Sequence, residues 1–293
     1  MSKPVISVIM TSYNNESYIG EAINSVLNQT FENFELIVVD DASNDKTDEI
    51  ISNFSDSRLI YYKNANNQGF PAPNRNYGLE QAAGKYIALI DADDVWKKDK
   101  LEKQLELMKE YQIDAVCTNY IIKYERDQKL IQKKTYNNSF LVDLNTLLAS
   151  NIIANSSILF RKSIINEIGN FCEDRNIIED YDYWLRLAAL KPNSILMHPE
   201  PLIYYRVHDE MTSKRDHARK WRMLKFVYEN NKKYITSDLV TKRIEECDVR
   251  INEEMIKEKI SKKQIMSAIR LMFTTNNHSF ALYKRLFRRI LRL

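Results

Sequence analysis

Segments typical of strands and segments typical of helices alternate four times near the start of this chain. The strand-like segments are short and mostly apolar, and they cover residues 5–10, 34–39, 59–62 and 86–90. The segments that read as helices cover residues 17–29, 47–54, 75–83 and 98–111. Such an alternation predicts an α/β fold with a parallel sheet.

Three carboxylates, Asp91, Asp93 and Asp94, directly follow the strand at residues 86–90. Ligands of open α/β sheets bind beyond the carboxyl ends of the strands. Unpaired acids at the end of a buried strand are costly, and a divalent cation held between carboxylates and a diphosphate would remove that cost. Oxygen ligands suit Mg²⁺ or Mn²⁺. The alternative is a solvated acidic turn that caps the next helix.

The first half therefore resembles a nucleotide-binding half-domain in its arrangement. It contains no Gly-x-x-x-x-Gly-Lys-Ser/Thr motif, and no Gly-x-Gly-x-x-Gly follows the first strand. We therefore expect a metal ion, rather than a glycine-rich loop, to hold the phosphates.

The second half has a more mixed pattern. We expect strands at residues 115–124, 157–160, 195–197 and 202–205, and helices at residues 141–148, at 162–168 and from 177 onward. Pro199 and Pro201 indicate an edge or a turn between the last two strands. From about residue 218 the pattern is helical and rich in lysine.

Composition limits the classes of function. The 293 residues allow one large domain with an appendage, and a net charge of +3 is too small to favour nucleic acid as a partner. The three cysteines are far apart and fit neither a zinc site nor a disulfide framework, so we expect a reducing, cytoplasmic setting. The first apolar run precedes a polar turn rather than a cleavage site, and no run approaches the ~18 apolar residues of a membrane span.

The end of the chain is strongly basic, with ten Lys or Arg and one acid from residue 257 onward. Within residues 280–293, apolar side chains share one helical face and five basic side chains share the other. This pattern favours a helix that lies on the inner face of the cell membrane. The alternative is a helix packed on the protein or on a second copy in a homo-oligomer.

Several motifs occur in an order that resembles the family 2 glycosyltransferases over residues 5–213. They are Ser7-Val8-Ile9-Met10-Thr11-Ser12-Tyr13-Asn14, Val38-Val39-Asp40-Asp41-Ala42-Ser43, Asn67-Gln68-Gly69, Arg75-Asn76, Gly84-Lys85-Tyr86, Asp91-Ala92-Asp93-Asp94, Glu179-Asp180 with Trp184 and Arg186, and Tyr205-Arg206-Val207-His208. The resemblance implies a GT-A fold, with a Rossmann-like, mostly parallel sheet flanked by helices. It places the glycosyltransferase domain at residues 1–215 and a helical extension at residues 216–293.

The resemblance also assigns a site for the donor. Thr11, Tyr13 and Asp41 match the family's nucleobase pocket, where a carboxylate can accept from uracil N3–H. This implies a UDP-sugar, although thymine offers the same donor. The alternative role of Tyr13 is to cover the edge of the sheet.

Further donor residues follow from the same resemblance. Arg75 matches a donor-binding arginine, or it is a surface charge at a helix start. Asp91 matches the residue near the ribose, and Asp93 matches the metal ligand. His208 matches a histidine near the metal and the diphosphate, or it is structural. Asp94 either assists the metal site or caps the following helix.

Asp180 matches the catalytic base of an inverting transfer, and Glu179 would position it or contact the acceptor. On spacing alone Asp182 competes for the same role. Asn155, Ser156 and Ser157 either line the acceptor side or form a polar turn, and Trp184 is either an acceptor platform or a buried anchor.

The implied reaction moves a hexose or N-acetylhexosamine to a hydroxyl of a growing bacterial surface glycan, on a lipid-linked or lipooligosaccharide acceptor. Two alternatives remain open. A non-catalytic sugar-nucleotide or glycan-binding module would not need Asp93 and Asp180 together. A nucleotidyltransferase usually carries a glycine-rich, basic loop after its first strand, and residues 11–15 have neither.

Overall fold

The computed structural model describes residues 3–132, 136–208, 217–235, 238–262 and 264–274. The contacts divide the chain into two compact units, one of Met1–Arg175 with Glu179–Asp209 and one of Asn176–Ile178 with Glu210–Leu293. The predicted domain boundary between residues 215 and 216 lies outside the described residues.

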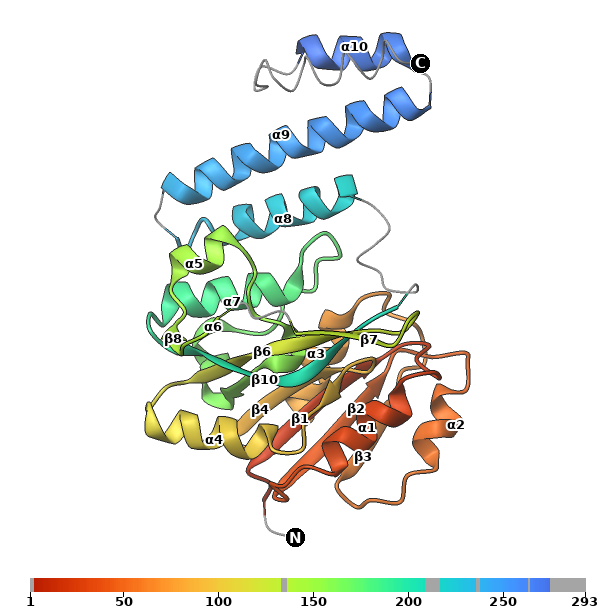
Figure 1. Ribbon diagram of the computed structural model, residues 1–293, viewed down its shortest axis with the longest axis vertical. Coiled ribbons are helices and arrows are strands. Elements are labelled where there is room, and N and C mark those ends of the chain that lie inside the picture. The colour runs from red at the N-terminus through yellow and green to blue at the C-terminus, as the bar shows by residue number, and fades with distance from the viewer. Residues whose placement is uncertain (1–2, 133–135, 209–216, 236–237, 263, 275–293) are drawn as a thin grey trace. The chain divides into compact units, whose positions relative to one another are not determined.

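The first unit is built on one mixed sheet with the strand order β3-β2-β1-β4-β9-β6-β10-β5 (Figure 1). Its strands are β1 (Ile6–Ser12), β2 (Phe34–Asp40), β3 (Leu59–Lys63), β4 (Tyr86–Asp91), β5 (Val95–Trp96), β6 (Ala115–Tyr124), β9 (Leu159–Arg161) and β10 (Ile195–Val207), with β7 (Lys129–Gln132) on β6 and β8 (Phe140–Leu141) on β10. The first four strands are parallel, as are β6 and β10. The short β9 runs antiparallel between β4 and β6. The predicted, mostly parallel GT-A sheet is thus confirmed.

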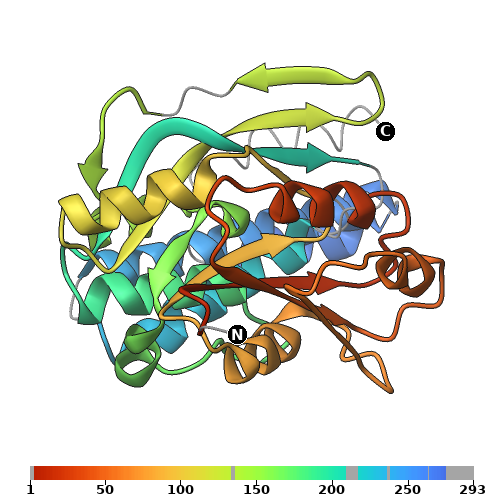
Figure 2. The same cartoon turned by 90° about the horizontal axis from the view of Figure 1, so that it is seen from below.

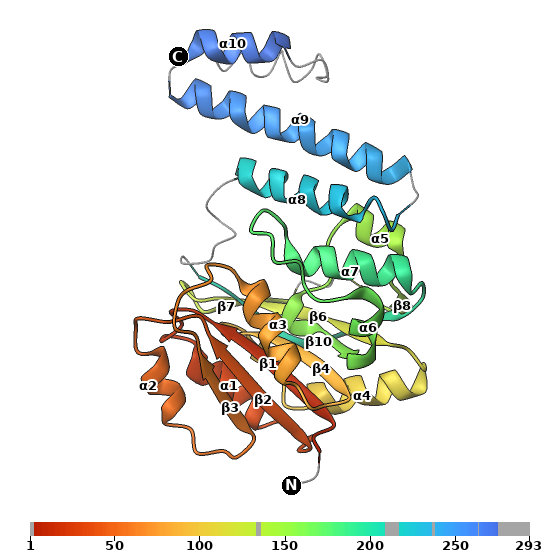
Figure 3. The ribbon, with the colours of Figure 1, turned by 180° about the vertical axis from the view of Figure 1, so that it is seen from behind.

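Helices cover both faces of this sheet (Figures 2 and 3). On one face lie α1 (Ile19–Leu27) and α4 (Lys100–Glu110), and on the other lie α3 (Pro71–Gln81), α6 (Ile165–Ile168) and α7 (Glu179–Leu190). The remaining helices of this unit are α2 (Thr47–Ser52) and α5 (Leu144–Ala149). Alternate residues of β1 belong to one core cluster with the buried face of α1. On the opposite face, a Cβ added to Gly78 would lie 2.6 Å from Ile9, so glycine permits α3 to approach β1 closely.

The register of the parallel strands brings the predicted site residues to one edge. Thr11 of β1 pairs with Asp91 of β4 on one side and with Val39 of β2 on the other. Ser12 pairs with Asp40, the last residue of β2. Because β1 is the central strand, the polar residues that follow β2 and β4 lie on either side of its end.

Three predicted elements differ from the structure. Helix α3 begins at Pro71 rather than at residue 75, because proline fits the first helical turn, where its missing N–H is not needed. Residues 195–207 form one strand rather than two, and the register shifts around Pro201 accommodate the prolines. The predicted helix at 141–148 begins only at Leu144, because Asp143 accepts the N–H of Thr146 and caps it.

The second unit is largely helical, as predicted, in its described part from residue 217 onward. It contains α8 (His217–Asn231), α9 (Asp238–Ser261) and α10 (Ile265–Thr274) (Figure 1). Lys225 of α8 and Asp248 of α9 form an ion pair of 2.7 Å. None of the described helices has both the length and the apolar character needed to cross a bilayer. The predicted amphipathic segment at residues 280–293 lies outside the described residues.

Candidate active site

Asp91 lies at the end of β4 in a network of fixed donors. Its carboxylate accepts from Arg75 Nη2 at 2.9 Å and from Asn155 Nδ2 at 3.1 Å. Its backbone N–H donates to Ser156 Oγ at 3.0 Å. About one third of the Asp91 side chain stays exposed, so the carboxylate is held in place and still faces the open edge of the sheet.

Asp93 and His208 are brought together from distant parts of the chain. Asp93 Oδ2 lies 3.0 Å from His208 Nε2, and both side chains are largely buried. Burial and the nearby Asp91 raise the pKa of Asp93, against the opposing effect of His208. An acid whose ionised form is disfavoured in this way has a strong electrostatic reason to accept a cation.

The Asp93–His208 pair fits the predicted divalent cation. Adjacent ligands of an octahedral ion, each about 2.1 Å from it, are about 3 Å apart, as these two atoms are. Across the described ranges, no group of three or more His, Cys, Asp or Glu side chains is arranged for a metal. The protein would therefore supply two ligands, and diphosphate and water the others, as is usual for Mg²⁺ sites.

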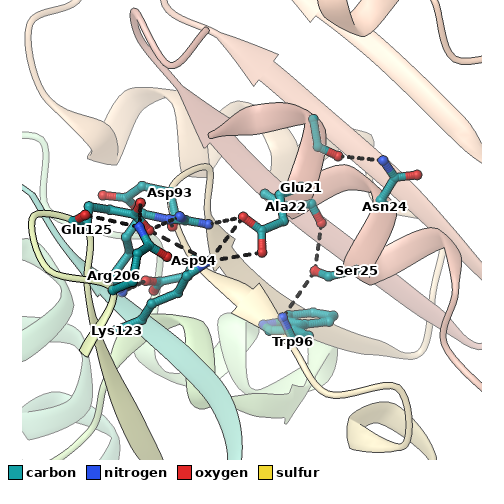
Figure 4. Close-up of polar contacts among 12 residues, drawn as sticks. Glu21, Ala22, Asn24, Ser25, Asp93, Asp94, Trp96, Lys123, Glu125 and Arg206 are labelled. Carbon is teal, nitrogen blue, oxygen red and sulfur yellow. Dashed lines mark hydrogen bonds and ion pairs between the residues drawn. The ribbon is translucent and has the colours of Figure 1, made fainter. Parts of the chain in front are cut away.

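Asp94 is fully buried and has a structural environment. Its Oδ1 accepts the backbone N–H of Arg206 at 3.0 Å (Figure 4). Burial, Asp93 and Asp91 hold the pKa of Asp94 well above its usual range. The predicted alternative that Asp94 caps the next helix is wrong, because the N-cap residue of α4 is Asp99. Asp94 instead ties the acidic loop to β10.

Asp41 organises the loop that follows β3. Its carboxylate accepts backbone N–H groups from Gln68 at 2.8 Å and Gly69 at 3.1 Å, and the Asn64 side chain at 3.0 Å. Gly69 has a φ of 81°, which favours glycine. A carboxylate has about four acceptor positions, and within the described residues three donors occupy those of Asp41, two on Oδ1 and one on Oδ2.

The other two predicted nucleobase residues lie beside this loop. Thr11 is half-buried at the end of β1, and the Tyr13 side chain is 47% exposed. Ala42, directly after Asp41, has a φ of 60°, and Asn14 one of 50°. Such backbone conformations are rare outside glycine and tend to occur at binding sites. The exposed Tyr13 ring is available to stack on a base, and this role stays a prediction.

Arg75 connects the acidic residues that follow β4 to those at the start of α7. It is only 5% exposed and forms ion pairs with Asp91 of β4 and Glu179 of α7. The prediction of a surface charge at a helix start is therefore wrong: tertiary packing buries Arg75. The pairs raise the pKa of Arg75 further, so it stays charged.

Asp180 has the properties of a general base. Burial and the neighbouring Glu179 raise its pKa to about 7, against the opposing effect of Arg75. Part of its side chain still reaches solvent. A carboxylate that titrates near neutral pH is well matched to proton abstraction.

Asp182 occupies a different environment, although it is only two residues away. It has no exposed surface and accepts from Arg186 Nε at 2.9 Å. Arg186 also donates to the carbonyls of Ile168 and Asn170. This buried network separates Asp182 from substrate, so the structure favours Asp180 over Asp182 as the base.

Burial decides between the alternative roles of Trp184 and between those of Asn155–Ser157. Trp184 is fully buried and contacts the rings of Phe160, Phe171 and Tyr183, so it is an anchor and not an acceptor platform. Residues Asn155–Ser157 form a buried 3-10 turn. Asn155 and Ser156 support Asp91, and the Ser157 hydroxyl donates to the carbonyl of Ala154, so this segment forms a structural polar turn.

Arg206 is a site residue to which the sequence analysis gave no role. It lies between the acidic loop and two glutamates, Glu21 and Glu125 (Figure 4). The only signal was its place next to His208 in the motif Tyr205-Arg206-Val207-His208. Spacing could not show which acids would surround it.

Comparisons with known proteins identify the family of this chain. The model of the family described as glycosyl transferase family 2 matches residues 7–169. An uncharacterized glycosyltransferase of Haemophilus influenzae is 37% identical over 209 residues, which cover 71% of this chain and 81% of that protein. The Escherichia coli UDP-Glc:alpha-D-GlcNAc-diphosphoundecaprenol beta-1,3-glucosyltransferase WfgD is 34% identical over 67% of this chain and 73% of its own.

Solved structures show the same fold. The S. aureus TarS fragment 1-349 in complex with UDP-GlcNAc has a TM-score of 0.66 at 21% identity, over 87% of this chain and 72% of the fragment. A longer TarS structure is matched over 43% of its length. With this fold and the match to the family model, the chain belongs to glycosyl transferase family 2 and is a glycosyltransferase with a GT-A fold.

Proposed function

We propose that this protein is an inverting, metal-dependent glycosyltransferase that moves a hexose or N-acetylhexosamine from a UDP-sugar to a hydroxyl of a growing bacterial surface glycan. The observation that carries the proposal is the double ion pair of Arg75. It joins Asp91, at the predicted donor side, to Glu179, beside the predicted base. One site therefore contains both a place for a nucleotide and a carboxylate for proton transfer.

The donor side rests on Asp41 and Tyr13. A carboxylate at Asp41, whose Oδ2 accepts one N–H within the described residues, would accept the N3–H of uracil, and the exposed Tyr13 ring suits stacking. TarS, which shares the fold, has been crystallised with UDP and with UDP-GlcNAc. A UDP-sugar is therefore the donor that we propose.

The metal side rests on Asp93 and His208, which would hold Mn²⁺ or Mg²⁺ together with the diphosphate. Such an ion stabilises the negative charge of a departing diphosphate. The 3.0 Å contact with His208 Nε2 orients Asp93 in the absence of a ligand.

Asp180 would take the proton from the acceptor hydroxyl as the hydroxyl oxygen attacks the anomeric carbon. The bond from that carbon to the diphosphate breaks, and the configuration inverts in one displacement. Glu179 and Arg75 hold the first turn of α7, which carries Asp180, beside the donor. Because this mechanism forms no covalent intermediate, it needs no second nucleophile.

The proposal for the acceptor rests on the name of a relative and on the basic segment at residues 280–293. WfgD, a relative, is named for a diphosphoundecaprenol-linked acceptor. The segment at residues 280–293 carries five basic residues, which would suit a peripheral position on an anionic membrane, where such a lipid resides. A lipid-linked glycan or a lipooligosaccharide is therefore the acceptor class that we propose.

The test is UDP release from a panel of UDP-sugars, measured with Mn²⁺, with Mg²⁺ and with a chelator. We expect at least one donor to be hydrolysed slowly with metal and not with chelator. Asp93→Ala should abolish turnover together with metal-dependent donor binding. Asp99→Asn is the matched control, because Asp99 pairs with Lys103 at the start of α4. UDP release that is unaffected by chelator would refute the role of the metal, and release of pyrophosphate from a sugar phosphate and UTP would indicate a nucleotidyltransferase.

A further inference from the structure

Arg206 forms a cluster of contacts with the acidic loop that carries Asp93 and Asp94 (Figure 4). Its side chain is 3% exposed. Its Nε donates to the backbone carbonyl of Asp93 at 2.6 Å, and its backbone N–H donates to Asp94. Arg206 therefore fixes the main chain of the acidic loop at the residue that carries the predicted metal ligand.

Two glutamates hold Arg206 in this position. Its Nη2 donates to Glu21 of α1 at 2.5 Å, and its Nη1 pairs with Glu125, which follows β6. Lys123 also contacts Glu21, at 3.1 Å, and Glu125, at 3.7 Å. The cluster contains two cations and two anions, so the charge of Arg206 is compensated by its glutamate partners. Its planar donors are shared among three partners, which a lysine could not reproduce.

A second route, a chain of side-chain contacts, leads from Arg206 to His208 through the ring of Tyr18. The guanidinium carbon of Arg206 lies 4.8 Å from the centre of the Tyr18 ring. The same ring lies 4.6 Å from the His208 ring, tilted by 42°. The orientation of a histidine ligand depends on what surrounds its ring. The Tyr18 ring therefore contacts both Arg206 and the second predicted ligand.

We propose that Arg206 is a positioning residue that sets both members of the metal-binding pair, Asp93 through its carbonyl and His208 through Tyr18. Arg206 contacts neither the metal nor the donor in this role. The inference rests on the proposed function, because it takes Asp93 and His208 as the ligands. It predicts that changes at Arg206 and Tyr18 weaken metal binding rather than the chemical step.

The test is calorimetric titration of Mn²⁺ into the full-length protein saturated with UDP, with Mn²⁺ titrated into UDP alone as the blank. Arg206→Lys should weaken Mn²⁺ binding by about 10- to 100-fold, as is usual for partners behind a metal ligand. Its kcat at saturating Mn²⁺ should stay close to that of the parent. Arg161→Lys is the matched control, since Arg161 pairs with Asp114 in another part of the sheet, and it should leave Mn²⁺ affinity unchanged.

A second pair of variants tests the route through Tyr18 and does not depend on how Arg206→Lys folds. Tyr18→Leu removes the ring and should weaken Mn²⁺ binding, whereas Tyr18→Phe keeps the ring and should not. Equal losses in both Tyr18 variants would overturn that route. Parent-like Mn²⁺ affinity in a folded Arg206→Lys protein, with a lower kcat, would overturn the positioning role. A parent that binds no Mn²⁺ would instead refute the proposed metal site, and with it this inference.

Discussion

The contrast between Asp182 and Asp180 gives a sharp prediction about stability. Asp182→Asn would remove one charge from a buried ion pair while preserving the shape of the side chain. Arg186 would keep its bonds to two backbone carbonyls. Within the part of the chain that the structure describes, Asp182 is the charged side chain that pairs with Arg186, so its loss would leave a buried guanidinium uncompensated.

The expected size of the effect follows from this geometry. Breaking a buried ion pair by removing one partner usually costs 3–5 kcal/mol, and we expect about 3 kcal/mol here because Asn still offers one acceptor oxygen. For a domain of this size, that free energy corresponds to a fall in Tm of roughly 6–12 °C. Turnover per folded molecule should stay within a few-fold of the parent, because Asp182 has no exposed surface.

Thermal unfolding followed by tryptophan fluorescence would measure the change in Tm, since Trp184 lies buried in the same helix. Active-site titration with donor would give the concentration of folded enzyme by which turnover is divided. The matched variant is Asp180→Asn, which should change turnover far more than Tm. An unchanged Tm in Asp182→Asn, together with a large loss of turnover, would show that Asp182 rather than Asp180 is the base.

Two further predictions concern the donor and the membrane. Asp41→Ala should weaken UDP binding and reduce discrimination against CDP, because it removes the carboxylate that we propose accepts from the uracil imide and also releases the loop at Gln68 and Gly69; calorimetry that shows unchanged UDP affinity in the folded variant would count against it. Deletion of residues 280–293 should abolish salt-sensitive sedimentation with anionic liposomes, where each of the five basic residues contributes about 1 kcal/mol, while donor hydrolysis continues. Equal liposome binding by the truncated protein would rule out this segment as the anchor.

The strands were predictable where the core is built from continuous apolar runs. β1, β2 and β4 are interior strands with helices on both faces, so their sequences contain continuous apolar runs and their polar residues lie mainly toward the ends. The start of α3 was not predictable in this way. Its residues Asn74, Arg75 and Asn76 are polar, yet all three are buried by tertiary contacts, and local hydrophobic patterns contain no information about such contacts.

The acidic positions of the site were predictable, but their partners were not. The order of motifs pointed to Asp91, Asp93 and Asp180, while the link through Arg75 required three elements to meet in space. The burial of Asp182 did leave a signal, because Arg186 follows it by four residues and pairs of this spacing meet on a helix. That spacing alone does not distinguish a buried pair from an exposed one.

The pH dependence of kcat/KM for UDP-sugar hydrolysis or transfer, at saturating Mn²⁺, tests the central claim most directly. The base acts only when ionised, and the pKa of Asp180 is raised to about 7. Activity should therefore fall as the pH drops below about 7 in the parent and in Asp182→Asn. Asp180→Asn should be slower by about 10² to 10⁴, the usual contribution of a positioned base, and should lose this pH dependence. An Asp180→Asn protein that keeps both the parent's rate and its acidic limb would contradict the account.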